Sequence, residues 1–249
     1  MAVMERSSAW VIGLLVMQVA VWSQTNQYLP RLGLLDQVPS SAEAKLSSIG
    51  DDQLYFRIAA IQLQNAGDSF GRFTALRDYN YELLRDWMMF MDDFDSQSNF
   101  LPAISSYYYS NTQRPADNQY IIEYLEKRYD QSPVENWWWL AQAVHLALNK
   151  MEDRPLALRL AYKLAATPHE KMPRWAQQMP IFVLEKMGER EQALAIVKDL
   201  ANKYNNYSQG EINFMNYFIQ ERLGYLKEEI KKKPKYATDD IFAAPYMDE

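Results

Sequence analysis

The chain has 249 residues, a net charge of −6 and no cysteine. The lack of cysteine excludes disulfides, thiolate metal ligands and cysteine nucleophiles, and the negative charge disfavours a nucleic-acid surface, which needs clustered lysine and arginine. Apolar residues make up 48% of the chain and glycines number only eight, so we expect a packed, all-helical protein.

The first segment, residues 1–24, predicts a membrane anchor. Residues 9–22 carry no charge and only one polar side chain, and Trp10 and Trp22 stand at their two ends. Tryptophans at both ends of an apolar stretch are typical of membrane spans. The uncharged run 7–23 would be about 25 Å long as a helix, near the lower limit for a span. A cleaved secretory signal and a buried N-terminal helix are the alternatives.

Residues 25–50 predict a linker between this anchor and a helical body. Proline, glycine and serine recur through the segment, as they do in chain that joins two folded parts. The segment also holds several leucines, which a purely flexible linker does not need. We therefore expect part of it to lie against the body.

Four helical segments are predicted next. Residues 52–64 place apolar side chains on one helical face, and residues 65–68 form a stop signal. Residues 70–94 contain a long second helix by the spacing of their apolar residues. Residues 100–110 and 117–129 form a further pair of helices.

Residues 137–204 repeat themselves with a period of 36. The shift places Trp139 on Trp175 and Gln142 on Gln178. Further matched pairs are Leu148 and Leu184, Lys150 and Lys186, Met151 and Met187, Arg154 and Arg190, Ala157 and Ala193, Leu158 and Leu194, Leu164 and Leu200, and Ala165 and Ala201. A fixed period of this size indicates stacked helical hairpins.

Each copy of the repeat predicts two helices joined by a short turn. In the first copy, residues 135–150 form the leading helix, Asp153 caps the following helix, and Pro155 lies in its first turn. In the second copy, Gly188 ends the leading helix that begins at Trp175. A last helix is predicted over 210–231, where it would cover the apolar end of the stack, and residues 232–249 predict a C-terminal tail.

These hairpins resemble the tetratricopeptide repeat (TPR) family. Its hairpins have glycine at the turn and alanine early in the second helix, and here Gly188 and Ala193 stand five residues apart. Ala157 holds the same alanine position in the first copy, and Pro168 closes that copy. Three features depart from the family pattern: the period exceeds the ~34 residues that are usual, His145 and Ile181 stand where the family has a small residue in the first helix, and Glu152 replaces glycine in the first turn.

The resemblance implies an all-α fold, a right-handed α-solenoid of TPR-like hairpins over residues 51–231, which the predicted transmembrane helix would precede. Leading-helix residues line the concave face of such stacks, and we expect this face to bind a protein or peptide. The partner-binding residues that the resemblance implies are Trp139, Gln142, Leu146, Asn149, Lys150, Trp175, Gln178, Phe182 and Lys186.

Two aromatic runs, residues 107–109 and 137–139, bear on this face as well. A helix turns about 100° per residue, so three consecutive aromatic side chains cannot all face one core. At least one of each trio should point into a groove or towards solvent. Packing between repeats is the structural alternative, and contact with a partner is the functional one, since exposed aromatic residues are enriched in binding hot spots.

No pattern in the sequence predicts catalysis, a metal or a cofactor. The chain has only two histidines, without the spacing of zinc ligands. The acids at 92, 93 and 95 lack the glycine and the closing glutamate of a calcium loop. Neither a glycine-rich phosphate loop nor a nucleophile elbow is present.

The sequence therefore predicts a non-enzymatic, membrane-tethered scaffold that binds a protein partner, with neither nucleic acid nor a small-molecule substrate. A structural or assembly subunit of a larger membrane complex is the alternative, and an enzyme of unrecognised type is a third. Positive charge beside the anchor is slight, and we expect a single-pass protein whose body lies on the non-cytoplasmic side.

Overall fold

The computed structural model describes residues 2–25, 34–69, 72–170, 172–203, 209–222 and 224. The chain divides into two compact units, residues 1–37 and residues 38–249. The described residues confirm the all-α prediction, because their only strands are β1 (Asp68–Ser69) and β2 (Arg72–Phe73), a two-residue antiparallel pair. The predicted C-terminal tail, 232–249, lies outside the described residues.

The first unit contains one helix, α1 (Ala2–Thr25). Ten large apolar side chains between Trp10 and Trp22 are each more than half exposed. Within the described part of the chain, no helix has both the length and the apolar character that crossing a membrane requires. The predicted anchor over residues 1–24 stays a prediction.

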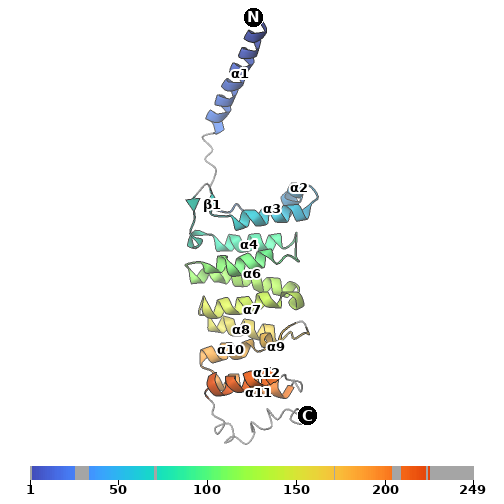
Figure 1. Ribbon diagram of the computed structural model, residues 1–249, viewed down its shortest axis with the longest axis vertical. Coiled ribbons are helices and arrows are strands. Elements are labelled where there is room, and N and C mark those ends of the chain that lie inside the picture. Colours follow the sequence, from blue (N-terminus) through green and yellow to red (C-terminus); the bar gives the residue numbers. More distant parts are fainter. Residues whose placement is uncertain are drawn as a thin grey trace, which may run out of the picture. The chain divides into compact units, whose positions relative to one another are not determined.

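The second unit is built of helices that follow one another in chain order (Figure 1). Their bounds are α2 (Ser41–Ser48), α3 (Asp52–Gln64), α4 (Tyr81–Met91), α5 (Phe100–Tyr107), α6 (Asn118–Gln131), α7 (Pro133–Asn149), α8 (Arg154–Ala165), α9 (Arg174–Gln177), α10 (Met179–Met187), α11 (Arg190–Lys203) and α12 (Gln209–Tyr217). Short 3₁₀ turns cover Leu76–Asp78, Tyr109–Asn111 and Pro115–Asp117, and a π-helical turn, Phe218–Arg222, continues α12.

Helix α2 lies within the residues that the sequence assigns to a linker. Ser40 and Glu43 form a capping box at its start: the Ser40 Oγ accepts from the Glu43 N–H at 3.3 Å, and the Glu43 carboxylate accepts from the Ser40 N–H at 2.8 Å. Helix α2 then packs against α3. The helical unit therefore begins before residue 51.

The long helix predicted within residues 70–94 is wrong in its length. Helix α4 begins only at Tyr81, where the Asn80 side chain accepts from the Leu83 N–H at 3.1 Å and caps the helix. Before it, Gly67 has a φ of 82° and its carbonyl accepts from the Thr74 N–H at 2.9 Å. The prediction rested on the spacing of apolar residues, and that spacing gives no sign of this turn. Gly67 supports the turn, and the β1–β2 hairpin lies within it.

The helices of the second unit form two sets. We call α3, α5, α7, the pair α9–α10, and α12 the leading helices, and α4, α6, α8 and α11 the following helices. The leading helices α3, α5, α7 and α10 each pack against the following helix of their own hairpin, and α6 and α8 also pack against the next leading helices, α7 and α10. Alanines that are completely buried at these crossings, Ala143, Ala147, Ala157 and Ala161, allow the helices to approach closely.

The two turns of the 36-residue repeat each contain a residue with a positive φ at the equivalent position, although the two residues differ. Gly188 ends α10 with a φ of 85°, and the next N–H, that of Glu189, donates to the Leu184 carbonyl at 2.9 Å. Glu152, 36 residues earlier, also has a positive φ, 58°. A residue with a β-carbon is strained there by about 1–2 kcal/mol. The equivalence of the two copies therefore extends to a position where the sequences disagree.

Ion pairs join the following helices to one another. Arg85 of α4 contacts Glu123 of α6 at 2.6 Å, and Arg159 of α8 contacts Glu126 of α6 at 2.7 Å. The Arg159 hydrogen bond lowers the pKa of Glu126 to about 2. These pairs are partly exposed, so each stabilises the fold only slightly.

A buried ion pair ties α4 to α6 more firmly. The Arg128 Nη1 lies 3.3 Å from the Asp92 Oδ1, and their side chains are 1% and 3% exposed. Tyr124 donates to the same carboxylate at 3.1 Å, and the Arg128 Nη2 donates to the Ser98 carbonyl at 3.1 Å. Burial raises the pKa of Asp92 to about 6, against the attraction of Arg128. Both the Arg128 and the Asp92 side chain are shielded from water, so each charge is stabilised mainly by the other.

Replacing Arg128 should therefore destabilise the second unit severely. We expect Arg128→Met to lower the free energy of unfolding by about 3–5 kcal/mol, because it leaves the Asp92 carboxylate buried without its partner. Arg159→Met, which removes a partly exposed partner of Glu126, should cost about 1 kcal/mol or less. Urea unfolding followed by circular dichroism measures both variants, and equal losses would contradict the role given to Arg128.

Candidate functional site

From α5 onwards, aromatic side chains join each leading helix to the next. Between α5 and α7, the rings of Tyr107 and Trp139 lie 6.5 Å apart at 65°. The Trp138 Nε1 donates to the Tyr107 hydroxyl at 3.0 Å, and the Trp139 Nε1 donates to the Asn99 side chain at 3.1 Å. The two tryptophans therefore both anchor α7 to α5, although they point in different directions.

Three tryptophans form the next junction, between α7 and α9. The Trp175 ring lies 5.6 Å from that of Trp137 and 6.1 Å from that of Trp138, at 73° and 88°. The Trp137 and Trp138 rings are themselves 5.7 Å apart at 88°. Edge-to-face contacts of this kind stabilise the junction beyond the apolar area that they bury.

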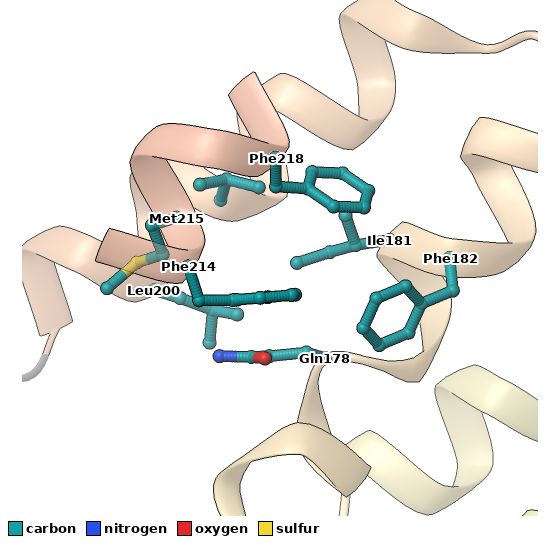
Figure 2. Close-up of a pocket in the computed structure, with 8 residues that line it drawn as sticks. Gln178, Ile181, Phe182, Leu200, Phe214, Met215 and Phe218 are labelled. Carbon is teal, nitrogen blue, oxygen red and sulfur yellow. The ribbon is translucent and has the colours of Figure 1, made fainter. Parts of the chain in front are cut away.

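Phenylalanines form the junction between α10 and α12. Phe182 lies 6.1 Å from Phe214 and 5.7 Å from Phe218. Figure 2 shows the three rings around a pocket, with the Gln178 side chain beneath Phe214. The space inside is about 10 Å³, enough for about one water molecule. This pocket is therefore a packing seam and is too small for a small-molecule ligand.

Some of the rings at these junctions are partly exposed to solvent. We call these rings the aromatic row, which consists of Tyr107, Trp138, Trp175, Phe182 and Phe214. Four of these residues are exposed by between 37% and 55%, and Phe182 is half-buried. Every leading helix from α5 to α12 thus contributes at least one partly exposed ring, and contacts join these rings into two groups, Tyr107–Trp138–Trp175 and Phe182–Phe214.

Uncharged polar groups and one cation lie beside the aromatic row at the end of α7. The Lys150 ammonium donates to the Asn111 side chain at 3.1 Å, which links α7 to the turn after α5. The Asn149 amide lies 3.1 Å from both the ring Nδ1 and the carbonyl of His145. All four residues are exposed or partly exposed, so this surface offers hydrogen bonds next to apolar rings.

A cleft of about 280 Å³ lies between the end of α3, the β1–β2 hairpin and α5. Its lining mixes backbone and side-chain polar groups of residues 64–68 with Phe73, Tyr79 and Tyr108. Tyr108 follows Tyr107 of the aromatic row directly in the chain. No ring of the aromatic row lines this cleft, so it is a separate recess at the first leading helix.

The residues that the resemblance implies for partner binding fall into two groups. Trp139, Leu146 and Gln178 are buried, at 7%, 2% and 7% exposure. The others are exposed or half-buried: Gln142, Asn149, Lys150, Trp175, Phe182 and Lys186. Their role in partner binding stays a prediction, but only the second group lies at the surface.

A break in the second copy explains why equivalent tryptophans differ in exposure. Helix α7 is continuous for 17 residues, and Trp139 lies on its buried side with Leu140 and Ala143. The second copy is split at Gln178, which ends α9 and precedes α10, where Pro180 lies in the first turn. Trp175 therefore belongs to a separate short helix, and the sequence shift does not preserve its direction.

Trp138 and Tyr107 are the surface residues that the family pattern missed. The two aromatic runs, residues 107–109 and 137–139, do indicate them, because at least one side chain of each run should point away from the core. That expectation is confirmed: Trp138 is 37% exposed beside a 7% exposed Trp139, and Tyr107 is 55% exposed while Tyr109 is fully buried.

The described residues bring together no group of three histidine or acidic side chains that could hold a metal ion. None of the family models, curated proteins or solved structures compared with this chain matches it. The candidate site therefore consists of the aromatic row and its polar neighbours, and its assignment rests on the positions and exposure of these residues.

Substitution of the two equivalent tryptophans should separate their roles. Trp139→Ala removes a buried ring and its hydrogen bond to Asn99, so it should lower the free energy of unfolding by about 3–5 kcal/mol. Trp175→Ala removes a ring that is 40% exposed and should cost roughly half as much. Thermal and urea unfolding measure both, and a larger loss for Trp175→Ala would contradict this assignment.

Proposed function

We propose that this chain is a non-enzymatic scaffold, a TPR-like right-handed α-solenoid that binds a protein partner along its leading helices. One observation carries the proposal: successive leading helices, α5 to α12, each contribute a ring of the aromatic row that contacts a neighbouring leading helix and stays partly exposed. Tryptophan and tyrosine are enriched at the energetic centres of protein interfaces, because they bury a large apolar area and also form hydrogen bonds.

An extended segment of a partner protein suits this surface better than a compact ligand. Tyr107, Trp138 and Trp175 lie on three successive leading helices, so a ligand must run across these helices to reach all of them. The exposed amides of Asn111 and Asn149, at the C-terminal ends of the α5 and α7 segments that carry these rings, would supply hydrogen bonds to the backbone of such a segment. The Lys150 ammonium adds attraction for an acidic residue.

We also propose that α1 tethers this scaffold to a membrane. The support is chemical: an uncharged stretch with a tryptophan at each end exposes its large apolar side chains on all sides of the helix. A helix with no polar face is unfavourable in water. The orientation proposed with it places the helical unit on the non-cytoplasmic side.

A structural or assembly subunit of a larger membrane complex is the second candidate. The observation that favours it is the number of large exposed apolar side chains, including Leu46 and Ile49 at 81% and 92%. In such a subunit neighbours would cover these side chains permanently. Aggregation of the purified chain without partners would favour this candidate, and a stable dispersed form would favour the scaffold.

Partner capture tests the binding surface. The full-length chain is crosslinked in its own membrane and recovered, and the crosslinked proteins of the wild type and of a Trp138→Ala, Trp175→Ala variant are compared. We expect loss of at least one crosslinked protein, by about tenfold or more, since two hot-spot rings are removed. Tyr162→Ala, which removes a 46% exposed ring from the following helix α8, is the matched control.

The comparison counts only where helicity is kept, which circular dichroism of each variant establishes. Unchanged capture by the double variant would overturn the proposed surface. Equal losses for Tyr162→Ala would show that the effect does not belong to the leading helices.

Membrane extraction tests the tether. Val16, which is 63% exposed near the middle of the apolar stretch, is replaced by aspartate. A carboxylate at the centre of a spanning helix costs about 2.5–3.5 kcal/mol, so we expect about 100-fold less chain to stay in the membrane pellet after carbonate washing. Gln53→Asp adds the same charge in the second unit and should leave pelleting unchanged. Complete extraction of the wild type by carbonate would contradict the tether.

A further inference from the structure

The cleft at the end of α3 gathers aromatic rings from three separate elements. Phe73 belongs to β2, Tyr79 precedes α4, and Tyr108 directly follows α5. Tyr79 is buried and its hydroxyl donates to the Ala66 carbonyl, whereas Phe73 and Tyr108 are 84% and 47% exposed. The cleft thus has one buried ring and two rings that a ligand can reach from solvent.

One carboxylate lies among these rings. The register of the β1–β2 hairpin pairs Asp68 directly with Phe73, so the two side chains lie on the same face of the hairpin, with β-carbons about 4.5–5.5 Å apart. Asp68 is the only charged residue among the described residues that line the cleft. Burial raises the pKa of Tyr79 to about 12, with smaller contributions from the nearby Tyr108 and Asp68. The carboxylate therefore acts close to the buried ring, and the cleft disfavours a further negative charge.

The described arginines nearby have other partners. The Arg114 guanidinium is paired with Asp117 at 2.9 Å, and that of Arg77 is paired with Asp78 at 3.8 Å. Within the part of the chain that the structure describes, no ion pair or side-chain hydrogen bond engages the Asp68 carboxylate. This carboxylate is therefore available to a cation from outside the chain.

We propose that this cleft binds a guanidinium group, the side chain of an arginine. A planar guanidinium stacks on an aromatic ring while its N–H groups donate to a carboxylate, so it uses both features of the cleft at once. The exposed amide side chains of Gln64 and Asn65 supply acceptors for its remaining N–H groups. At about 280 Å³, the cleft lies just below the ~300–1,000 Å³ of sites for drug-sized ligands and suits a single side chain.

Other classes of ligand fit these groups less well. A phosphate or a carboxylate would be repelled by Asp68, the one charged group of the described lining. An apolar ligand would take water from that carboxylate and offer it no hydrogen bond in return. An ammonium group is a compact and strongly hydrated charge, so it matches the aromatic rings less closely than a planar guanidinium does.

Two sources carry this group, an arginine within a protein segment and free arginine, and the test includes both. Saturation-transfer NMR on the full-length chain in detergent measures the dissociation constants of N-acetyl-arginine methylamide, which copies an arginine within a chain, and of free arginine. The citrulline analogue of each compound replaces the guanidinium by a neutral group of nearly the same shape. We expect the citrulline analogues to bind at least about tenfold more weakly, because they lack the charge that attracts the carboxylate and the rings.

Two variants show whether the binding belongs to the cleft. Asp68→Asn keeps the shape of the side chain and removes its charge, and Phe73→Leu keeps an apolar side chain and removes the ring. Each should weaken binding of the arginine compounds at least about threefold. Asp93→Asn removes an equal charge from an exposed position outside the cleft and should leave binding unchanged. Circular dichroism checks that each variant keeps its helicity, which we expect because all three side chains are exposed.

Three results would overturn the proposal: no binding of either arginine compound, equal binding of the citrulline analogues, or binding that Asp68→Asn and Phe73→Leu leave unchanged. Tighter binding of N-acetyl-arginine methylamide would assign the cleft to an arginine of a protein segment, and tighter binding of free arginine would assign it to the amino acid. The Trp138→Ala, Trp175→Ala variant should bind both compounds as the wild type does, because no ring of the aromatic row lines the cleft. The failure of partner capture and the failure of guanidinium binding are therefore separate outcomes.

Discussion

The second unit depends on contact between successive leading helices. Each hairpin buries one side of its leading helix against its own following helix, and this leaves an apolar edge that only the next hairpin can cover. Aromatic rings cover that edge here: Tyr107 meets Trp139, Trp175 meets the tryptophans of α7, and Phe182 meets Phe214 and Phe218. Because the contact repeats along the chain, it joins the hairpins and also leaves ring edges at the surface, so stability and the candidate binding site share the same residues.

The following helices are joined by different chemistry. Partly exposed arginine side chains of α4 and α8 reach the carboxylates of α6, and the buried Arg128–Asp92 pair also joins α4 to α6. Charged pairs at a surface are well hydrated and offer little to a partner, whereas partly exposed rings do. The two sets of helices therefore present unlike surfaces, and the proposed partner surface belongs to the leading set.

Much of this arrangement could be predicted from the sequence. The 36-residue period located the hairpins of α7 to α11, and Asp153 and Gly188 marked their caps and turns. The candidate site was predicted less well, because a family pattern assigned Trp139 and Leu146 to the surface one residue away from the exposed Trp138 and His145. A shift of one residue rotates a helical side chain by about 100°, so a small error of register exchanges core and surface.

Local signals determined by themselves that the chain is helical, where most helices begin and end, and that two hairpins are equivalent. The spacing of apolar residues, helix caps and helix-breaking residues act over a few positions, so their effects can be read from the sequence. Only the tertiary structure decided that Asn80 and the hairpin after Gly67 shorten α4, that Trp139 is buried while Trp175 is exposed, and that Glu152 adopts the backbone conformation of a glycine. These features depend on which neighbour covers each side chain, and that is settled when separate helices pack together.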